Sequence, residues 1–413
     1  MNNNKDLFKV ITLCEARNIL RPYWQNFFAR KEEVALKESL NRLLAKDIQV
    51  QWPVPHYPKA TVDGLAVRAK DTFGAGEGLP ALLNCKGEVL MGCTPNIALG
   101  PGEGMLIPTG GMLPGGADAV VMVEDLEKYD EELYGVTKPI APGENVITVG
   151  EDLQEGEVIL TKYSRIRPQE MGLLAAQGLL KIPVVQRLKI GILSTGDEIV
   201  DPEVQPEPGQ TRDINGYTLL WQAIASGAQG KYYGIVKDDQ KQLVEALQRM
   251  LEENDIVLLS GGSSVGARDF TAEIIQELGE PRVLFHGLAL RPGKPTIAGS
   301  VQGKLIFGLP GHPASAMVVF DALLRPFLEG TVLKEEALPL PEGILTQNLY
   351  SGTGREEYVR VRLRQEGQEW YAEPIRGKSG LLRPMVEADG YVHIGLNTEG
   401  IEAGKRVKIR LWR

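Results

Sequence analysis

Residues 188–198 read LKIGILSTGDE. The apolar first half of this stretch has the length of one buried strand, and the chain then turns through Ser-Thr-Gly into two carboxylates. A short apolar run that ends in a glycine-rich turn recurs at 255–266, DIVLLSGGSSVG, and at 304–313, KLIFGLPGHP. Three such strand-to-helix turns predict a sheet with functional loops at its strand ends.

Strands alternate with helices from Leu188 to Glu329. The predicted elements are strands at 188–194, 231–236, 255–260 and 304–310, and helices from about 216, over 240–253, after 269 and from 313. The helix over 240–253 has apolar residues at helical spacing, and Asp238 or Asp239 is placed to cap its first turn. This alternation predicts a doubly wound, mainly parallel α/β domain with helices on both faces.

The N-terminal half has two different patterns. Leucines recur at helical spacing before residue 47, so we expect packing helices there that include Leu36, Leu40, Leu43 and Leu44. Many glycines and short apolar runs follow and predict a β-rich module. The chain then begins extended again and ends in a helix opened by Pro168, so the β-rich module can be an insertion.

The predicted organisation is therefore multidomain α/β. The predicted domains are a helical and extended domain of 1–47 plus 143–186, an inserted β-rich module of 48–142, the central domain of 187–329, and a C-terminal β-barrel-like domain of 330–413.

The composition excludes several classes of partner. The 413 residues carry a formal net charge of -9, so no basic field exists to collect nucleic acid or an anionic membrane. No stretch has the form of a signal peptide or the length of a membrane span, which predicts a cytoplasmic protein. Cys14, Cys85 and Cys93 fit neither a zinc site nor a disulfide framework, and we expect reduced structural thiols.

The first turn suggests a metal site. Asp197 and Glu198 follow a strand that ends in Ser194, Thr195 and Gly196. Paired carboxylates at a strand end suit Mg2+, which prefers oxygen ligands and completes its shell with water and phosphate. The structural alternative is a helix-capping Asp197 and a solvated Glu198.

The other two turns suggest an anion site. In the second turn, Gly261, Gly262 and Gly266 let the backbone approach a ligand, and Ser263 and Ser264 offer hydroxyl donors. Backbone amides at the start of the next helix would favour an anion. This turn is not a Walker A loop, and a tight connection is the alternative. In the third turn, Pro310 and Gly311 combine fixed and permissive backbone angles before a helix begun by Pro313. His312 receives no catalytic role, because an isolated turn histidine is more often structural.

A constrained cationic turn lies just upstream. Residues 290–299 read LRPGKPTIAG, in which Arg291 and Lys294 bracket the turn and Pro295 closes it. A charge pair at about 4 Å near a protein surface is worth up to about 4 kcal/mol, against roughly 0.3 to 1 kcal/mol for a helix N-terminus. We therefore interpret this turn as an oxyanion clamp.

Together these motifs resemble the molybdopterin molybdenumtransferase family, whose relatives include the matching domain of gephyrin. The resemblance rests on the order and spacing of STGDE, SGGSSVGARDF, RPGKP and GLPGHPAS. It extends to TVDGLAV, PTGGMLPGGADAVVMVED and RPQEMGLLAAQG, so nearly the whole chain is covered. The resemblance implies the domain division drawn above, a homodimer, and insertion of molybdate into adenylylated molybdopterin with release of AMP and with magnesium present.

The resemblance also implies roles for individual residues. Asp197, Glu198 and Asp269 would lie around the magnesium and the nucleotide phosphates, with Asp238 or Asp239 nearby. Asp63 and Thr109 would reach the site from the partner subunit. The molybdate pocket would be formed by Lys294, Arg291, Arg355 and Ser379. Candidate protein partners are a molybdopterin adenylyltransferase and the recipient apoenzymes.

The sequence departs from the family pattern at a few positions. These departures are Val62, Leu65, Ser263, Arg291 and His312. Arg291 keeps the charge of the usual lysine but changes the donor geometry, so tungstate and molybdate both stay open as the preferred oxyanion.

Two other functions stay open from the sequence. The central domain alone also resembles molybdopterin adenylyltransferases, although the Asp63, Thr109 and C-terminal segments count against that function. A non-catalytic scaffold or sensor that binds a pterin or a partner protein is the alternative from another class.

Overall fold

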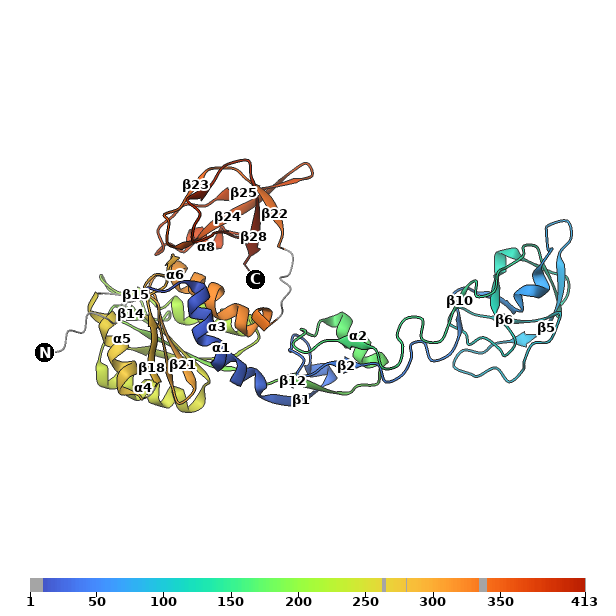
Figure 1. Cartoon of the computed structure of the whole chain (residues 1–413), viewed down its shortest axis with the longest axis horizontal. Helices are drawn as coiled ribbons and strands as arrows, with labels where there is room; N and C mark the ends of the chain where they lie inside the picture. Colours follow the sequence, from blue (N-terminus) through green and yellow to red (C-terminus); the bar gives the residue numbers. More distant parts are fainter. Residues whose placement is uncertain (1–9, 262–264, 280, 334–339, 413) are drawn as a thin grey trace. The chain divides into compact units, whose positions relative to one another are not determined.

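The structure, a computed structural model, describes residues 10–261, 265–279, 281–333 and 340–412, with 265–270, 281, 282 and 333 described through the backbone alone. The chain forms two compact units. The first holds the chain up to Lys46, Tyr163–Arg167 and Lys181 onward, and the second holds Asp47–Lys162 and Pro168–Leu180 (Figure 1). No helix in the described ranges is long and apolar enough to cross a membrane.

A six-stranded sheet forms the centre of the first unit. Its strands, in spatial order, are β16 (Gln229–Val236), β13 (Lys189–Thr195), β17 (Ile256–Gly261), β21 (Lys304–Leu309), β20 (Ile297–Val301) and β18 (Pro281–His286). The first four are parallel, as the alternating pattern predicts, whereas β20 runs antiparallel to both of its neighbours. Sequence analysis did not predict the last two strands, so the sheet is mixed at one edge.

Helices cover both faces of this sheet, which confirms the predicted doubly wound α/β domain (Figure 1). Residues alternate between two apolar cores along each strand: Ile256 and Leu258 face one core, and Val257 and Leu259 face the other. The first core is packed against α1 (Leu13–Ala29), α3 (Asn215–Ala225), α6 (Pro313–Val319), the π-helical turn η4 (Phe320–Leu324) and α7 (Arg325–Leu328). The second is packed against α4 (Gln240–Glu253) and α5 (Val265–Glu277).

The helix starts follow local capping chemistry. Asp239 caps α4, because its carboxylate accepts the amide hydrogen of Gln242 at 2.8 Å, and this confirms one of the two predicted caps. Pro313 is the first residue of α6, as predicted. The helix that we expected after Asp269 is α5, which begins at Val265, so Asp269 lies inside the helix rather than before it.

The prediction of a helix around Leu36–Leu44 is wrong. The chain instead forms β1 (Lys31–Ala35) and a short 3-10 turn, η1 (Leu36–Glu38). β1 pairs antiparallel with β12 (Lys181–Val185), which lies far away in the sequence. Leu43 and Leu44 are buried by tertiary packing while Leu40 is exposed, so the leucine spacing did not reflect one helical face. In addition, α1 packs into the core of the central sheet, whereas the predicted division placed it in a separate domain.

The C-terminal residues of the first unit form a closed five-stranded barrel. Its strands, in order around the barrel, are β24 (Glu356–Glu366), β25 (Glu369–Pro374), β22 (Glu342–Leu345), β28 (Arg406–Leu411) and β26 (Gly390–Ile394), which pairs back to β24. The alternating runs at 358–364 and 407–411 are strands, as predicted, and their inward residues form the barrel core. A short strand from the central domain, β19 (Leu290–Arg291), adds to β24 in parallel.

The second unit contains another six-stranded sheet. Its strands, in spatial order, are β7 (Ala119–Met122), β4 (Gly64–Val67), β6 (Glu103–Ile107), β5 (Ala81–Glu88), β9 (Leu133–Val136) and β8 (Leu126–Lys128). Gly64 is required where β4 passes β7, because a Cβ at this position would lie 1.9 Å from the carbonyl oxygen of Val121. The unit also holds β2 (Ile48–Gln49), β3 (Lys59–Ala60), β10 (Val146–Ile147), β11 (Val158–Leu160) and α2 (Pro168–Ala176).

Candidate functional site

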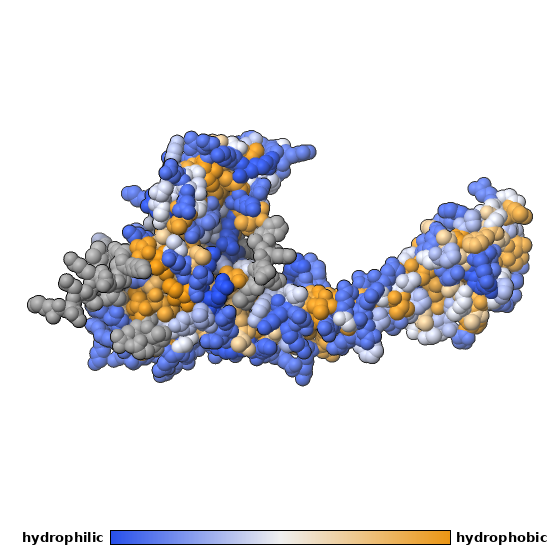
Figure 2. All heavy atoms as spheres, viewed as in Figure 1, coloured by the Kyte–Doolittle hydropathy of each residue, from blue (hydrophilic) through white to orange (hydrophobic). Residues whose placement is uncertain are grey.

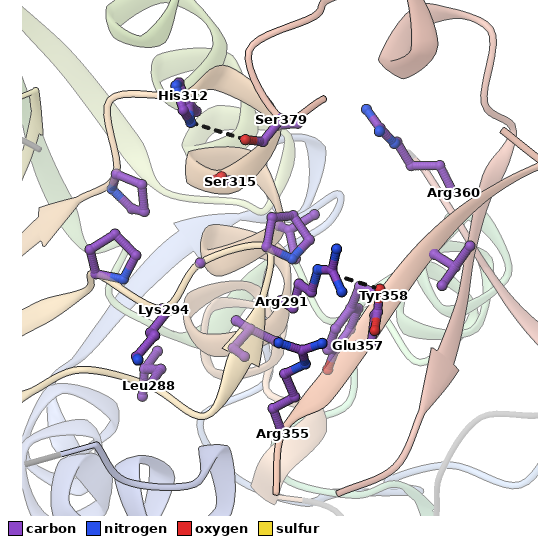
Figure 3. A pocket seen from close by; sticks show the side chains of 18 of the residues that line it. Leu288, Arg291, Lys294, His312, Ser315, Arg355, Glu357, Tyr358, Arg360 and Ser379 are labelled. Atoms are coloured by element: carbon purple, nitrogen blue, oxygen red, sulfur yellow. Dashed lines mark hydrogen bonds and ion pairs between the residues drawn. The ribbon is translucent and has the colours of Figure 1, made fainter. Parts of the chain in front are cut away.

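A cavity of about 1000 Å3 lies between the central α/β part and the barrel of the first unit (Figure 3). Its walls are the turn at 288–295, the turn into α6 at 310–318, the start of β24 at 353–360 and the loop at 375–379. It brings together six residues that the sequence assigned to substrate binding, namely Arg291, Lys294, Pro295, Pro310, Arg355 and Ser379. They come from four separate segments of the chain.

The cationic turn is fixed against both walls. Leu290 and Arg291 pair with Glu356 and Glu357 of β24, which attaches the turn to the barrel. Within the turn, the amide of Leu288 donates to the carbonyl of Lys294 at 3.0 Å. Arg291 and Lys294 are therefore presented to the cavity by a backbone that hydrogen bonds hold at both ends.

Positive charge dominates the cavity lining. Its cationic side chains are Arg291, Lys294, Arg355, Arg360, Arg376 and Lys378, and Glu357 is the one carboxylate among the described lining residues. Arg291 Nε lies 3.7 Å from Glu357 Oε1, so this carboxylate offsets only part of the charge. In a chain with a formal net charge of -9, such a concentration of cations marks a local anion site.

Two arginines on the barrel side of the cavity have side-chain N–H groups for which the described residues provide no acceptor. Arg355 Nε and Arg360 Nη1 are buried and have no hydrogen-bond partner among the described residues. Burial lowers the pKa of Arg360, although its guanidinium still donates from Nη2 to the carbonyl of Gly377 at 2.8 Å. A buried donor without a partner costs free energy, which an anion near these arginines would offset. Arg360, Arg376 and Lys378 were not predicted, because a basic residue on an alternating strand or loop has no distinguishing local signal.

Ser379 lies on the opposite wall from Arg355. Its Oγ is 3.0 Å from Nδ1 of His312, and Figure 3 shows this pair at one end of the cavity. The amide of Ala314 donates to the carbonyl of Ser379 at 3.2 Å, so the loop at 375–379 is attached to the first turn of α6.

A second group of predicted residues lies at the carboxyl ends of the parallel strands. Ser194 and Thr195 are the buried last residues of β13, and Asp197 and Glu198 are exposed in the turn that follows. Thr195 Oγ1 donates to Asp238 at 2.8 Å, and the amide of Asp238 approaches Asp197 Oδ1 at 3.4 Å.

Two glycines shape this end of the sheet. A Cβ at Gly261 would lie 1.9 Å from the carbonyl oxygen of Thr195, so only glycine allows β17 to end so close to β13. The carboxylate of Glu198 folds over Gly196, since a Cβ there would lie 2.7 Å from Oε2 of Glu198. The predicted carboxylates Asp197, Glu198 and Asp238 therefore gather around one turn.

Two buried polar residues beside the glycine-rich turns, Asp213 and Asn215, were not predicted from the sequence. Asn215, the first residue of α3, donates from Nδ2 to Ser260 Oγ at 2.7 Å and to the carbonyl of Gly311 at 2.8 Å. Its Oδ1 is buried without a partner among the described residues. Asp213 accepts from the amide of Gly216 at 3.0 Å and from the hydroxyl of Tyr232 at 2.5 Å.

The signal for these residues was present in TRDINGY. Two polar side chains precede the helix that we expected from about Gly216, and both are buried. Burial, together with the hydrogen bond to Asp213, raises the pKa of Tyr232 well above its usual range, so this tyrosine stays a neutral donor. The buried amide of Asn215 thus joins the second turn, at Ser260, to the third, at Gly311.

Part of the predicted site is not described. Gly262, Ser263 and Ser264 lie outside the described residues, and Gly266 and Asp269 are described through the backbone of α5 alone. Among the side chains that the structure describes, no three His, Cys, Asp or Glu residues are grouped closely enough to hold a metal ion.

Asp63 and Thr109 form a contact of their own in the second unit. β4 pairs antiparallel with β6, and Gly64 lies opposite Ile107. Asp63 comes just before Gly64 and Thr109 comes two residues after Ile107, so both lie at the same end of this strand pair. Asp63 Oδ1 accepts from the amide of Thr109 at 2.6 Å and from its hydroxyl at 2.9 Å. These bonds, the amide first, lower the pKa of Asp63, so its carboxylate is ionised and oriented.

The chain matches known families over most of its length. Residues 11–178 match the MoeA N-terminal region (domain I and II), 191–330 match a probable molybdopterin binding domain, and 342–412 match the MoeA C-terminal region (domain IV). The resemblance drawn from the motifs is thereby confirmed.

Relatives and solved structures agree with these matches. The chain is 37% identical over 389 residues to a putative molybdopterin biosynthesis protein of Methanocaldococcus jannaschii, covering 92% of each. It is 33% identical over 387 residues to a molybdopterin molybdenumtransferase of Bacillus subtilis, covering 92% of this chain and 90% of that one. A molybdopterin biosynthesis MoeA protein from Pyrococcus horikoshii superposes with a TM-score of 0.82 and 30% identity over 98% of this chain and 100% of that chain. The chain therefore belongs to the MoeA family of molybdenum cofactor biosynthesis proteins.

Proposed function

We propose that this chain is a molybdopterin molybdenumtransferase that inserts molybdate into adenylylated molybdopterin and releases AMP. The observation that carries the proposal is the cationic cavity, which gathers Arg291, Lys294, Arg355 and Ser379 in an otherwise acidic chain. Similarity over 92% of the chain to relatives named molybdopterin molybdenumtransferase supports the transferase activity.

The cavity suits a tetrahedral oxyanion. Lysine and arginine donors approach from the turn at 290–295 and from β24, and a hydroxyl is added by the loop at 375–379. Charge-assisted hydrogen bonds from several directions hold a small dianion in one orientation. Its volume exceeds that of a single oxyanion, so the cavity has room for the reacting end of the pterin as well.

The carboxylates at the strand ends suit a magnesium ion. Asp197 and Glu198 are exposed carboxylates, the oxygen donors that Mg2+ prefers, and Asp197 accepts from the amide of the neighbouring Asp238 at 3.4 Å. We propose Asp197, Glu198 and Asp269 as its ligands and the adjacent glycine-rich turns as the nucleotide site. Magnesium, when bound, polarises the phosphoanhydride. The residues of this chain then act by positioning two anions, and the proposal assigns no covalent nucleophile.

The proposal includes a homodimer in the cytoplasm. The Asp63–Thr109 pair would reach the nucleotide from the partner subunit, which explains why an exposed carboxylate is held by two hydrogen bonds. The cysteines Cys14, Cys85 and Cys93 are free thiols, the form that a reducing compartment maintains, although Cys14 and Cys93 are exposed rather than structural.

A purified-component assay tests this function. We expect AMP release from adenylylated molybdopterin that requires both molybdate and magnesium. ATP-dependent adenylylation without consumption of molybdate would instead favour an adenylyltransferase. Binding of the pterin substrate without any release of AMP would favour a non-catalytic scaffold or sensor.

A further inference from the structure

The third strand-to-helix turn carries a histidine that the proposed chemistry does not use. His312 lies between β21 and α6, and its Nδ1 is 3.0 Å from the Oγ of Ser379. Both residues line the cationic cavity, and Figure 3 shows them joined at one wall. The contact therefore links a candidate oxyanion donor to a titratable ring.

Hydrogen bonds hold the backbone around Ser379 in place, so the direction of its hydroxyl hydrogen is what can vary. The carbonyl of Ser379 accepts from the amide of Ala314, and the carbonyl of Gly377 accepts from Arg360. The imidazole ring lies against the same loop, since a Cβ at Gly380 would be 3.6 Å from Cδ2 of His312. The hydroxyl can rotate, and the proton on Nδ1 of His312 decides where it points.

We propose that His312 is a positioning residue that sets whether the Ser379 hydroxyl donates to the bound oxyanion, so that oxyanion affinity depends on the protonation of the imidazole. This inference rests on the proposed function, because it takes the cavity as the oxyanion site.

The state of Nδ1 gives Ser379 opposite roles: a neutral ring with its proton on Nε2 leaves Nδ1 as an acceptor, whereas a protonated ring always donates from Nδ1. When Nδ1 carries no proton, it accepts the hydroxyl hydrogen of Ser379, and only the lone pairs of Oγ face the anion. When the imidazole is protonated, Nδ1 donates to Oγ and the hydroxyl hydrogen is free for the oxyanion. A charge-assisted hydrogen bond to the oxyanion is gained in the second state.

Other charged groups surround this pair in the cavity. They are Arg376 and Lys378 from the loop itself, Arg355 just before β24, Glu357 and Arg360 from β24 together with the titratable Tyr358, Arg291 from β19, and Lys294 from the turn after β19. The helix α6 adds no charged residue. Histidine is the residue type whose ordinary pKa lies nearest to neutral pH, whereas lysine, arginine, tyrosine and glutamate ordinarily titrate further from it.

Calorimetric titration of the full chain with molybdate at about pH 6 and about pH 8 tests the inference. We expect the wild-type affinity to be about tenfold weaker at the higher pH, the size of one such hydrogen bond. His312→Asn keeps a hydrogen-bonding amide near Nδ1 without a titration, so its affinity should not change with pH. Ser379→Ala should bind weakly at both pH values. His56→Asn, at an exposed histidine of the second unit, is the matched control and should keep the wild-type dependence.

The possible failures can be told apart. Equal wild-type affinities at the two pH values would overturn the inference while leaving the oxyanion site intact. A pH dependence that persists in Ser379→Ala would show that the imidazolium acts directly on the anion, which also overturns it. Absence of wild-type binding at both pH values would refute the oxyanion site itself, and with it this inference.

Discussion

The hydroxyl of Tyr391 in the barrel donates to Oδ2 of Asp321 in the central domain at 2.5 Å. Asp321 lies in the π-helical turn η4, and its other oxygen accepts from Arg325 at 2.6 Å. All three side chains are buried, and burial raises the pKa of Tyr391 above its usual range. This contact fixes the barrel against the α/β domain, and the cationic cavity lies between these two parts.

Tyr391→Phe should lower both stability and oxyanion affinity. The substitution leaves a buried carboxylate with one partner fewer, which costs about 1–3 kcal/mol. Chemical denaturation gives the first effect and molybdate titration the second. Tyr350→Phe, at an exposed tyrosine of the same C-terminal part of the chain, is the control and should change stability by less than about 0.5 kcal/mol. Unchanged stability in Tyr391→Phe would refute the structural role of this hydrogen bond.

Lys294→Gln should weaken molybdate binding by about 10- to 100-fold, since it removes one charge from an anion site near the surface. The fold should persist, because the turn is held by backbone bonds of its own. Calorimetric titration measures the affinity. Lys241→Gln on the exposed face of α4 removes the same charge outside the cavity and should have little effect. Equal losses in both variants would point to a general electrostatic effect.

Glu198→Ala should abolish AMP release without changing the thermal denaturation temperature, because the side chain is exposed in the turn after β13. The purified-component assay and a melting curve measure the two effects. Glu203→Ala, another exposed carboxylate shortly after in the chain, should retain activity. Full activity in Glu198→Ala would remove this residue from the magnesium site.

Thr109→Val should raise the pKa of Asp63 part of the way towards its ordinary value of 3.8. The amide of Thr109 remains and is the larger cause of the lowered pKa, so the shift should be incomplete. The carbon chemical shift of the carboxyl group, followed against pH, measures it.

The sign of the related stability effect follows from linkage. Because folding lowers the pKa of Asp63, the pair stabilises the fold above the ordinary pKa of aspartate and loses this contribution as the pH falls through the lowered value. Thr109→Val should therefore show a smaller loss of stability on acidification than the wild type. An unchanged Asp63 pKa would exclude the hydroxyl bond.

Local chemistry was enough to predict several elements. Asp239 caps α4 and Pro313 starts α6, since caps and proline act within one turn of the chain. The region around Leu36–Leu44 failed because β1 pairs with β12, and a partner so far along the chain overrides a local leucine pattern.

Some residues of the candidate site could be predicted from the sequence, and others could not. Arg291 and Lys294 stood out because a constrained Arg-Pro-Gly-Lys-Pro turn is unusual, whereas Arg360 looked like any exposed strand residue. Asn215 was missed because its importance lies in joining Ser260 to Gly311. The contact between His312 and Ser379 could not be predicted, since it depends on how the barrel meets the central domain.

We propose above all that the cavity between the α/β domain and the barrel binds the oxyanion. Anomalous X-ray scattering from crystals grown with tungstate, an oxyanion of the same shape and charge as molybdate, locates the metal atom directly. We expect the tungsten peak in this cavity, in contact with Lys294, Arg355 and Ser379. A tungsten peak at another site, with none in this cavity, would contradict the assignment of the cavity as the oxyanion site.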